Sequence, residues 1–302
     1  MLDGIAVQNP NGACIVVKNG ATHVTIRNSE IGPCKTHGVD IQTATDVHVE
    51  NVWIHTTTGN AVNANQASSL TVTKSCLDHV STGVYAQQST GVVVEANAVK
   101  NVQGPFPRGQ LAQLNAASGP GNRIRCNVLD DVAGDSNPED SINLYKSNGT
   151  AASPILVEGN RIRGGGPSTS GGGILLGDGG DSSHQIARGN VLADPGQYGV
   201  AIASGTDVTL DGNRVFSSQH AWSNVGLYVW NQYDSPCGPV LVTKNQVQWT
   251  SKTGQKNGFW DSSQSPAMPT FPSCTSTTIA SDNDWAAPLD ANVVLATPSV
   301  CP

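Results

Sequence analysis

Charged side chains that could act as acids, bases or cationic binding groups are concentrated in the middle of this chain. Three segments rich in Gly, Pro and Ser lie there, at 101–110, 133–141 and 164–173. These segments and the stretches "KSNGT" and "GDGGD" contribute Arg108, Asp135, Glu139, Asp140, Lys146, Asp178 and Asp181. Two carboxyl groups, one with a raised pKa, could perform general acid–base catalysis, and a lysine could abstract a proton.

Four of these residues also have an ordinary structural interpretation. Glu139 and Asp140 could solubilise a loop and cap a turn. Lys146 could be a solvated turn lysine, and Arg108 could pair with a loop carboxylate. The seven cysteines lack the spacing of a zinc site, and "SGGGILLGDGGD" lacks the Lys-Ser/Thr of a phosphate loop. The sequence therefore predicts no metal site and no nucleotide site.

The segment after each small-residue turn repeats one alternating pattern, as in "GVDIQ", "GVYAQ", "SINLY" and "GVAIA". Successive copies lie 22 to 32 residues apart, with no stretch typical of a crossover helix. Stacking such coils at the strand spacing of ~4.8 Å buries one continuous core. The pattern predicts a parallel β-helix with two inward columns: Val39, Val62, Val84, Ala112, Ile142, Ile174, Val200 and Leu227, and Ile41, Ala64, Ala86, Leu114, Leu144, Leu176, Ile202 and Val229.

An asparagine follows an alternating apolar run in each of six coils. An apolar residue stands two positions after each one. At an inward-facing turn, such amides can bond to one another and to the turn backbone of successive coils. We predict a structural ladder of Asn97, Asn127, Asn160, Asn190, Asn213 and Asn245.

This motif, apolar-x-apolar-x-x-Asn-x-apolar over roughly residues 5–250, resembles the right-handed parallel β-helix proteins of the pectate-lyase-like superfamily. The resemblance implies an all-β fold: a single-stranded right-handed parallel β-helix, a solenoid of about eight to ten coils, with an irregular C-terminal cap. The repeat ends near residue 250, so we expect the β-helix over 1–250 and the cap, packing on the last coils, over 251–302. The superfamily includes lyases, hydrolases, epimerases, esterases and phage tailspikes, so the fold does not fix the function.

The stretch "EDSINLYKSNG" resembles the acid-then-"KS" stretch of the chondroitinase and alginate lyase branch. That resemblance implies that Lys146 abstracts a proton, with Arg108 near the substrate carboxylate and Tyr145 beside them. Lyases of this superfamily neutralise a uronate with Ca²⁺ or with cationic side chains, so a bound Ca²⁺ is compatible and the cofactor stays undetermined. The "DPH" motif of the epimerases is absent.

Side chains that alternate with the core columns point outward in a β-helix. In four successive coils they are amides and phenols, which match the hydroxyl groups of carbohydrate. This patch comprises Asn63, Asn65, Tyr85, Gln87, Gln113, Asn115, Asn143 and Tyr145. The same outward columns continue with Gly177 opposite Tyr145 and end at Tyr228 and Trp230. Those two aromatic residues could stack on sugar rings or be covered by the cap.

Composition limits the possible partners and compartment. The net charge is −7 and no basic run occurs, which argues against nucleic-acid binding. No apolar stretch approaches the roughly 20 residues of a membrane span. No signal peptide is visible, and an abrupt start suggests a piece of a longer protein. Cys237, Cys274 and Cys301 could form a disulfide, which would indicate an extracellular or periplasmic protein.

We therefore expect a carbohydrate-active protein that binds a polysaccharide in a groove along the first parallel sheet. The leading hypothesis is a lyase of a uronate-containing glycan, with Lys146, Arg108, Tyr145 and Asp140 as catalytic residues. The alternatives are a glycoside hydrolase that uses Asp140 as acid and Asp178 as base, and a non-catalytic carbohydrate-binding or adhesion module. The oligomeric state is undetermined. The expected substrate-binding residues are Asn63, Tyr85, Gln113, Asn143, Asp178, Tyr228 and Trp230.

Overall fold

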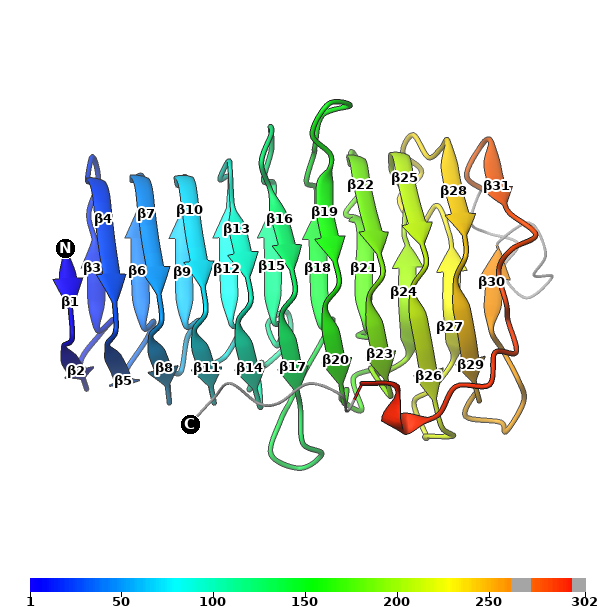
Figure 1. Ribbon diagram of the computed structural model, residues 1–302, viewed down its shortest axis with the longest axis horizontal. Coiled ribbons are helices and arrows are strands. Elements are labelled where there is room, and N and C mark those ends of the chain that lie inside the picture. The colour runs from blue at the N-terminus through cyan, green and yellow to red at the C-terminus, as the bar shows by residue number, and fades with distance from the viewer. Residues whose placement is uncertain (262–272, 295–302) are drawn as a thin grey trace.

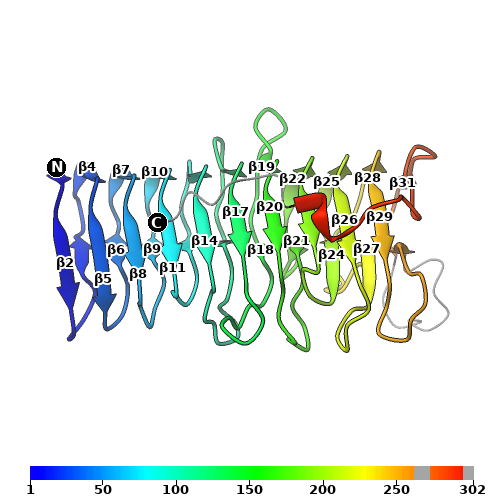
Figure 2. The same cartoon turned by 60° about the horizontal axis from the view of Figure 1, so that its bottom comes forward.

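The computed structural model describes residues 1–261 and 273–294 and shows an all-β solenoid (Figure 1). Short strands of three parallel sheets recur in the same order along the chain, and each pairs with its counterpart in the next coil. Figure 2 shows the same stack of coils turned about its long axis. The predicted right-handed parallel β-helix is confirmed.

Sheet A has eleven strands within the described residues. They are β1 (Leu2–Asp3), β4 (Thr22–Arg27), β7 (Thr45–Glu50), β10 (Ser68–Thr73), β13 (Val93–Glu95), β16 (Arg123–Arg125), β19 (Ile155–Glu158), β22 (Ser183–Arg188), β25 (Thr206–Asp211), β28 (Val240–Thr243) and β31 (Thr277–Ile279).

Sheet B has ten strands in the same parts of the chain. They are β2 (Ala6–Asn9), β5 (Glu30–Cys34), β8 (Trp53–His55), β11 (Cys76–Asp78), β14 (Ala98–Lys100), β17 (Val128–Asp130), β20 (Arg161–Arg163), β23 (Val191–Ala193), β26 (Arg214–Ser217) and β29 (Gln246–Trp249).

Sheet C, which carries the predicted groove, also has ten strands among the residues described. They are β3 (Ile15–Val17), β6 (Val39–Gln42), β9 (Val62–Asn65), β12 (Val84–Gln87), β15 (Ala112–Asn115), β18 (Ile142–Tyr145), β21 (Ile174–Asp178), β24 (Tyr198–Ile202), β27 (Val225–Val229) and β30 (Phe259–Asp261).

The two predicted apolar columns of sheet C are fully buried and form part of one core along the solenoid axis. Val62 pairs with Val84, which pairs with Ala112, and the register continues to Leu227. Because side chains alternate along a strand, the residues between these columns face outward. The pairs Asn63–Tyr85, Tyr85–Gln113 and Gln113–Asn143 confirm the first outward column.

The asparagine ladder is present as predicted, at the turn between sheets A and B. Each side-chain amide donates to the Oδ1 of the asparagine in the next coil, at 2.9–3.0 Å from Asn97 to Asn245. Each Oδ1 also accepts a backbone N–H from the preceding coil, and each Nδ2 also donates to a backbone carbonyl. Asn283 extends the ladder by one coil. These six amides are buried and fully engaged in holding the turn.

The C-terminal residues contribute both strands and a covering segment. β30 and β31 continue sheets C and A beyond residue 250. The short 3₁₀ helix η1 (Ala291–Val294) packs against β20, β23 and β26, as Figure 1 shows in red. No helix in the described ranges is long and apolar enough to cross a membrane.

Disulfides tie neighbouring coils at both ends of the described chain. Cys14 is bonded to Cys34, and Cys237 to Cys274. The second bond confirms the disulfide predicted in the C-terminal part. The third cysteine considered there, Cys301, lies outside the described residues.

Candidate active site on the outer face of sheet C

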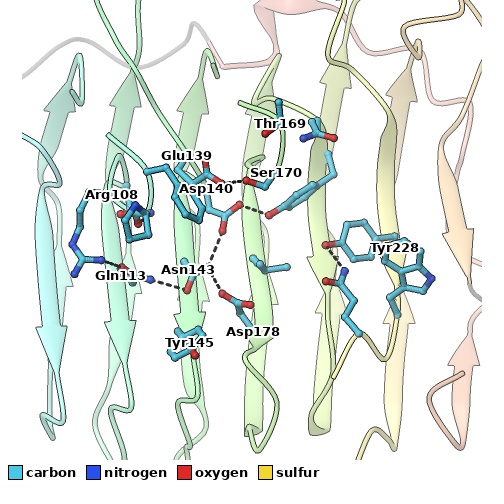
Figure 3. A pocket seen from close by; sticks show the side chains of 18 of the residues that line it. Arg108, Gln113, Glu139, Asp140, Asn143, Tyr145, Thr169, Ser170, Asp178 and Tyr228 are labelled. Carbon is cyan, nitrogen blue, oxygen red and sulfur yellow. Dashed lines mark hydrogen bonds between the residues drawn. The ribbon is translucent and has the colours of Figure 1, made fainter. Parts of the chain in front are cut away.

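A pocket of ≈ 880 Å³ lies on the outer face of sheet C (Figure 3). The three long segments at 101–110, 133–141 and 164–173 all connect a strand of sheet B to the next strand of sheet C, so they emerge at one corner of the solenoid. The pocket gathers eight of the residues that the sequence nominated: Arg108, Gln113, Asp140, Asn143, Tyr145, Asp178, Tyr228 and Trp230.

Two carboxyl groups from adjacent coils meet at one amide. The Asn143 Nδ2 donates to Asp140 Oδ2 at 2.7 Å and to Asp178 Oδ2 at 2.8 Å, as Figure 3 shows. The two Oδ2 atoms therefore cannot lie further apart than the sum of these bonds, about 5.5 Å. This limit fits the ~5–5.5 Å spacing of retaining glycosidases and is shorter than the ~6.5–9.5 Å of inverting ones. One primary amide thus fixes the spacing of both acids.

A β-bulge places Asp178 in the pocket. Asn143 pairs with Leu175, but Tyr145 pairs with Asp178, so β21 carries one extra residue. The prediction that Gly177 stands opposite Tyr145 is wrong for this reason. Gly177 has φ +69°, and a Cβ there would lie 1.9 Å from the carbonyl oxygen of Ser204. The bulge therefore needs glycine at this position, and it turns Asp178 outward.

Asp140 is a buried carboxyl group with an elevated proton affinity. Burial raises its pKa to about 7, although hydrogen bonds from Tyr198 and Asn143 act in the opposite direction, and the nearby charges of Asp178 and Glu139 raise it further. The backbone N–H of Gly172 also donates to Asp140 Oδ1, at 3.1 Å. Asp140 therefore holds its proton at mildly acidic pH, which suits a general acid.

Neighbouring hydroxyl groups engage the other two carboxyl groups. Glu139 accepts bonds from Ser168 and Ser170, both 2.5 Å long, which anchor the 164–173 loop. Tyr233 donates its phenol proton to Asp178, and burial together with this bond raises the pKa of Tyr233. Glu139 is therefore used in holding a loop, whereas Asp140 and Asp178 face each other across Asn143.

Arg108 supplies the cationic side chain of the pocket lining. Its Nη1 donates to Gln113 Oε1 at 2.9 Å, and its guanidinium lies 3.9 Å from the centroid of the Tyr85 ring. The Gln113 Nε2 in turn donates to Asn143 Oδ1 at 3.3 Å. A polar chain therefore runs from Arg108 to the carboxyl pair and orients the bridging amide.

Three nominated residues lie outside this lining. Lys146 is exposed on a left-handed turn, with its Nζ 5.7 Å from the centroid of the Tyr145 ring. Asn63 lies three coils before Asn143 and bonds to Asp40 and Asn60. Tyr85 does not line the pocket itself but contacts two lining residues: its ring packs against the Arg108 guanidinium, and its hydroxyl accepts a hydrogen bond from the Asn115 amide.

Sequence reasoning missed several lining residues, including Tyr198, Tyr233 and Trp260. Tyr198 shares the alternation of the core residue Val200, which would place it inside. It begins β24 at the corner of the solenoid and turns instead toward Asp140. Tyr233 comes from a loop with no repeat signal, and Trp260 lies beyond residue 250, where the sequence pattern of the repeat ends.

No cluster of three or more His, Cys, Asp or Glu side chains suited to a metal ion occurs within residues 1–261 and 273–294. His79 bonds instead to Asp78 and Asp135.

The sequence matches the family described as "Right handed beta helix region" over residues 1–151, half of the chain. The chain belongs to the right-handed β-helix family. A search of curated proteins gives no significant match.

Solved structures of this fold give further matches. PfbA, a surface adhesin of Streptococcus pneumoniae, has a TM-score of 0.60 at 12% identity, over 78% of this chain and 61% of that one. The catalytic domain of a GH87 alpha-1,3-glucanase in complex with nigerose has a TM-score of 0.56 at 12% identity, over 93% and 63%. A variant of that domain with tetrasaccharides has a TM-score of 0.54 at 12% identity, over 93% and 63%. The chain spans about three fifths of these structures, and the likeness concerns the fold.

Proposed function

We propose that this protein hydrolyses a glycosidic bond of a polysaccharide in the sheet C pocket, with Asp140 as general acid and Asp178 as the second carboxylate. The observation that carries the proposal is the Asn143 amide, which holds both carboxyl groups while burial raises the pKa of Asp140 to about 7. Pairs of this kind, with one protonated and one charged member, are what glycosidases use.

The chemistry follows from the two environments. Protonated Asp140 transfers its proton to the glycosidic oxygen as the bond from that oxygen to the anomeric carbon breaks. Asp178 attacks the anomeric carbon as that bond breaks and forms a covalent glycosyl ester. Water then displaces Asp178 from the anomeric carbon and gives a proton to the Asp140 carboxylate, which restores both groups. Asn143 keeps the two groups at fixed spacing, and Tyr233 orients Asp178.

Several further observations support a polysaccharide substrate. The pocket crosses several coils and is lined by amides and aromatic rings, which suit sugar hydroxyl groups and ring faces. The GH87 domain of the same fold is described with nigerose and tetrasaccharides bound. The Cys14–Cys34 and Cys237–Cys274 disulfides favour an exported protein, as expected for an enzyme acting on glycans outside the cell.

A panel of neutral and acidic polysaccharides tests this proposal. We expect new reducing ends without an ultraviolet-absorbing unsaturated product. Asp140→Asn and Asp178→Asn should each abolish most of the activity. Asp135→Asn is the matched control, because Asp135 belongs to the same loop but bonds to His79 and Asn101 outside the pocket. Full turnover by both pocket variants would contradict the proposal.

The alternative enzyme activity is that of a polysaccharide lyase. Arg108 in the pocket lining favours it, because a cation there could neutralise a uronate carboxylate. It requires Lys146 as the base, and Lys146 lies on an exposed turn outside the lining. An unsaturated product that Lys146→Ala eliminates would establish the lyase. Saturable binding of a glycan without any cleavage would instead indicate a binding or adhesion module.

A further inference from the structure

We infer, resting on the proposed function, that the half of the pocket beyond β21 binds uncharged sugar units, so that the substrate is a neutral polysaccharide rather than a uronate. This part of the lining comes from β24, β27, β30 and their loops. It extends three strand spacings from β21 to β30, about 14 Å, which is the length of about three sugar rings.

Charge is divided unevenly along the pocket. Among the lining residues that the structure describes, the charged ones are Arg108, Glu139, Asp140 and Asp178, and all of them lie at or before the end of β21. Beyond that point every lining residue is an amide or an aromatic residue, among them Asn224, Gln232, Trp230 and Trp260. Among the described residues, the lining of this half therefore contains no cationic group that could neutralise a carboxylate.

A continuous run of aromatic rings forms the floor of the uncharged half. The Tyr198 and Tyr228 ring centroids are 5.1 Å apart, Tyr228 and Trp230 are 5.6 Å apart, and Trp230 and Trp260 are 5.1 Å apart. These rings belong to an apolar cluster separate from the core inside the solenoid. Trp230 and Trp260 remain partly exposed, so they can offer apolar surface to a sugar while amides bind its hydroxyl groups.

A uronate unit would be unfavourable on this floor. Its carboxylate would lose water without gaining a counter-charge, and the nearest charged lining groups, Asp140 and Asp178, are acidic. Arg108 stands on the opposite side of the carboxyl pair, as Figure 3 shows, and its guanidinium is stacked on Tyr85. A neutral sugar loses no charge solvation and gains the aromatic contact.

Binding can be separated from cleavage in the Asp140→Asn protein. Calorimetry would compare gluco-, xylo- and manno-oligosaccharides with oligogalacturonates, each as a short and a long member. We expect a neutral series to bind more tightly as its length increases, and oligogalacturonates to bind more weakly at equal length. Adding Trp260→Ala to the Asp140→Asn protein should weaken the binding of the long neutral ligand about tenfold, which corresponds to about 1.4 kcal/mol. It should weaken the binding of the short ligand less.

Two further variants test whether the effect depends on an aromatic ring at position 260 and not on the loss of any tryptophan. Trp260→Phe should recover most of the affinity, because it keeps a ring beside Trp230. Trp53→Ala should change nothing, because Trp53 stacks on His55 in sheet B, away from the pocket. Thermal unfolding would confirm that each variant folds.

The outcomes distinguish this inference from the proposed function. Tighter binding of oligogalacturonates, no neutral binding, or an equal Trp260→Ala loss at every length would overturn the inference, even if hydrolysis is observed. Length-dependent neutral binding with no hydrolysis by the wild-type protein would support the inference and refute the proposed function.

Discussion

Replacing Asp140 by asparagine tests the assignment of the general acid. Asparagine has nearly the same shape, but it has no acidic proton to donate to the leaving oxygen. General acid catalysis typically contributes 10²–10⁴-fold, so we expect turnover of an unactivated glycan to fall by about that factor, or about 3–5 kcal/mol in activation free energy. The loss should be much smaller on an aryl glycoside, whose leaving group needs little protonation.

The pH profile provides a second, independent readout. Burial places the pKa of Asp140 at about 7, so the acid is protonated, and activity is present, below that pH. Activity should fall tenfold for each pH unit above about 7 in the wild-type protein, and this alkaline limb should be absent from the residual activity of Asp140→Asn.

The assay is initial-rate reducing-end formation from pH 5 to pH 9, with Asp135→Asn as the control that should behave as wild type. If the Asp140→Asn protein keeps more than a tenth of wild-type turnover on the unactivated glycan, the assignment of Asp140 as the general acid is refuted. An unchanged alkaline limb in that variant would refute it as well.

Four other changes have defined outcomes. Tyr198→Phe removes a hydrogen bond that lowers the pKa of Asp140, so the alkaline limb should move to higher pH; a shift to lower pH contradicts this account. Asn160→Ala leaves buried polar groups of the ladder without partners, and each such group costs about 1–3 kcal/mol of stability. This variant should therefore lower the melting temperature far more than Asn51→Ala at an exposed turn, and equal effects would contradict the role of the ladder. Burial raises the pKa of Asp131 to about 8, so protonated Asp131 stabilises the fold fully below about pH 4, and this stabilisation is lost as the pH rises through 8. Asp131→Asn should reduce the difference in unfolding free energy between pH 5 and pH 9, measured in urea, by several kcal/mol. Lys146→Ala should leave hydrolysis within about twofold of wild type, and a complete loss would favour elimination.

The periodic features of this molecule could be predicted from the sequence because each coil repeats the same physical constraint. Val62, Val84 and Ala112 align because burial acts on every second residue of each strand. Asn127 and Asn160 could be recognised because an inward turn requires the same amide in every coil. The long loops lie at one corner of the solenoid because each interrupts the same step of the repeat, between a strand of sheet B and the next strand of sheet C.

The site was less predictable because it depends on departures from the repeat. One extra residue at Gly177 shifts Asp178 into register with Tyr145, and alternation gives no sign of such a bulge. Tyr198 lies at a corner, where strand alternation no longer determines direction. The elevated pKa of Asp140 depends on its burial beside the 164–173 loop. That loop bonds to Asp140 through the Gly172 N–H and to Glu139 through Ser168 and Ser170.

Mass spectrometry of the products formed in heavy-oxygen water tests the central claim most directly. Hydrolysis by the Asp140–Asp178 pair adds water across the broken bond, so brief reactions should place one heavy oxygen atom at each new reducing end. Products that are unsaturated and carry no heavy oxygen would show elimination and contradict the account.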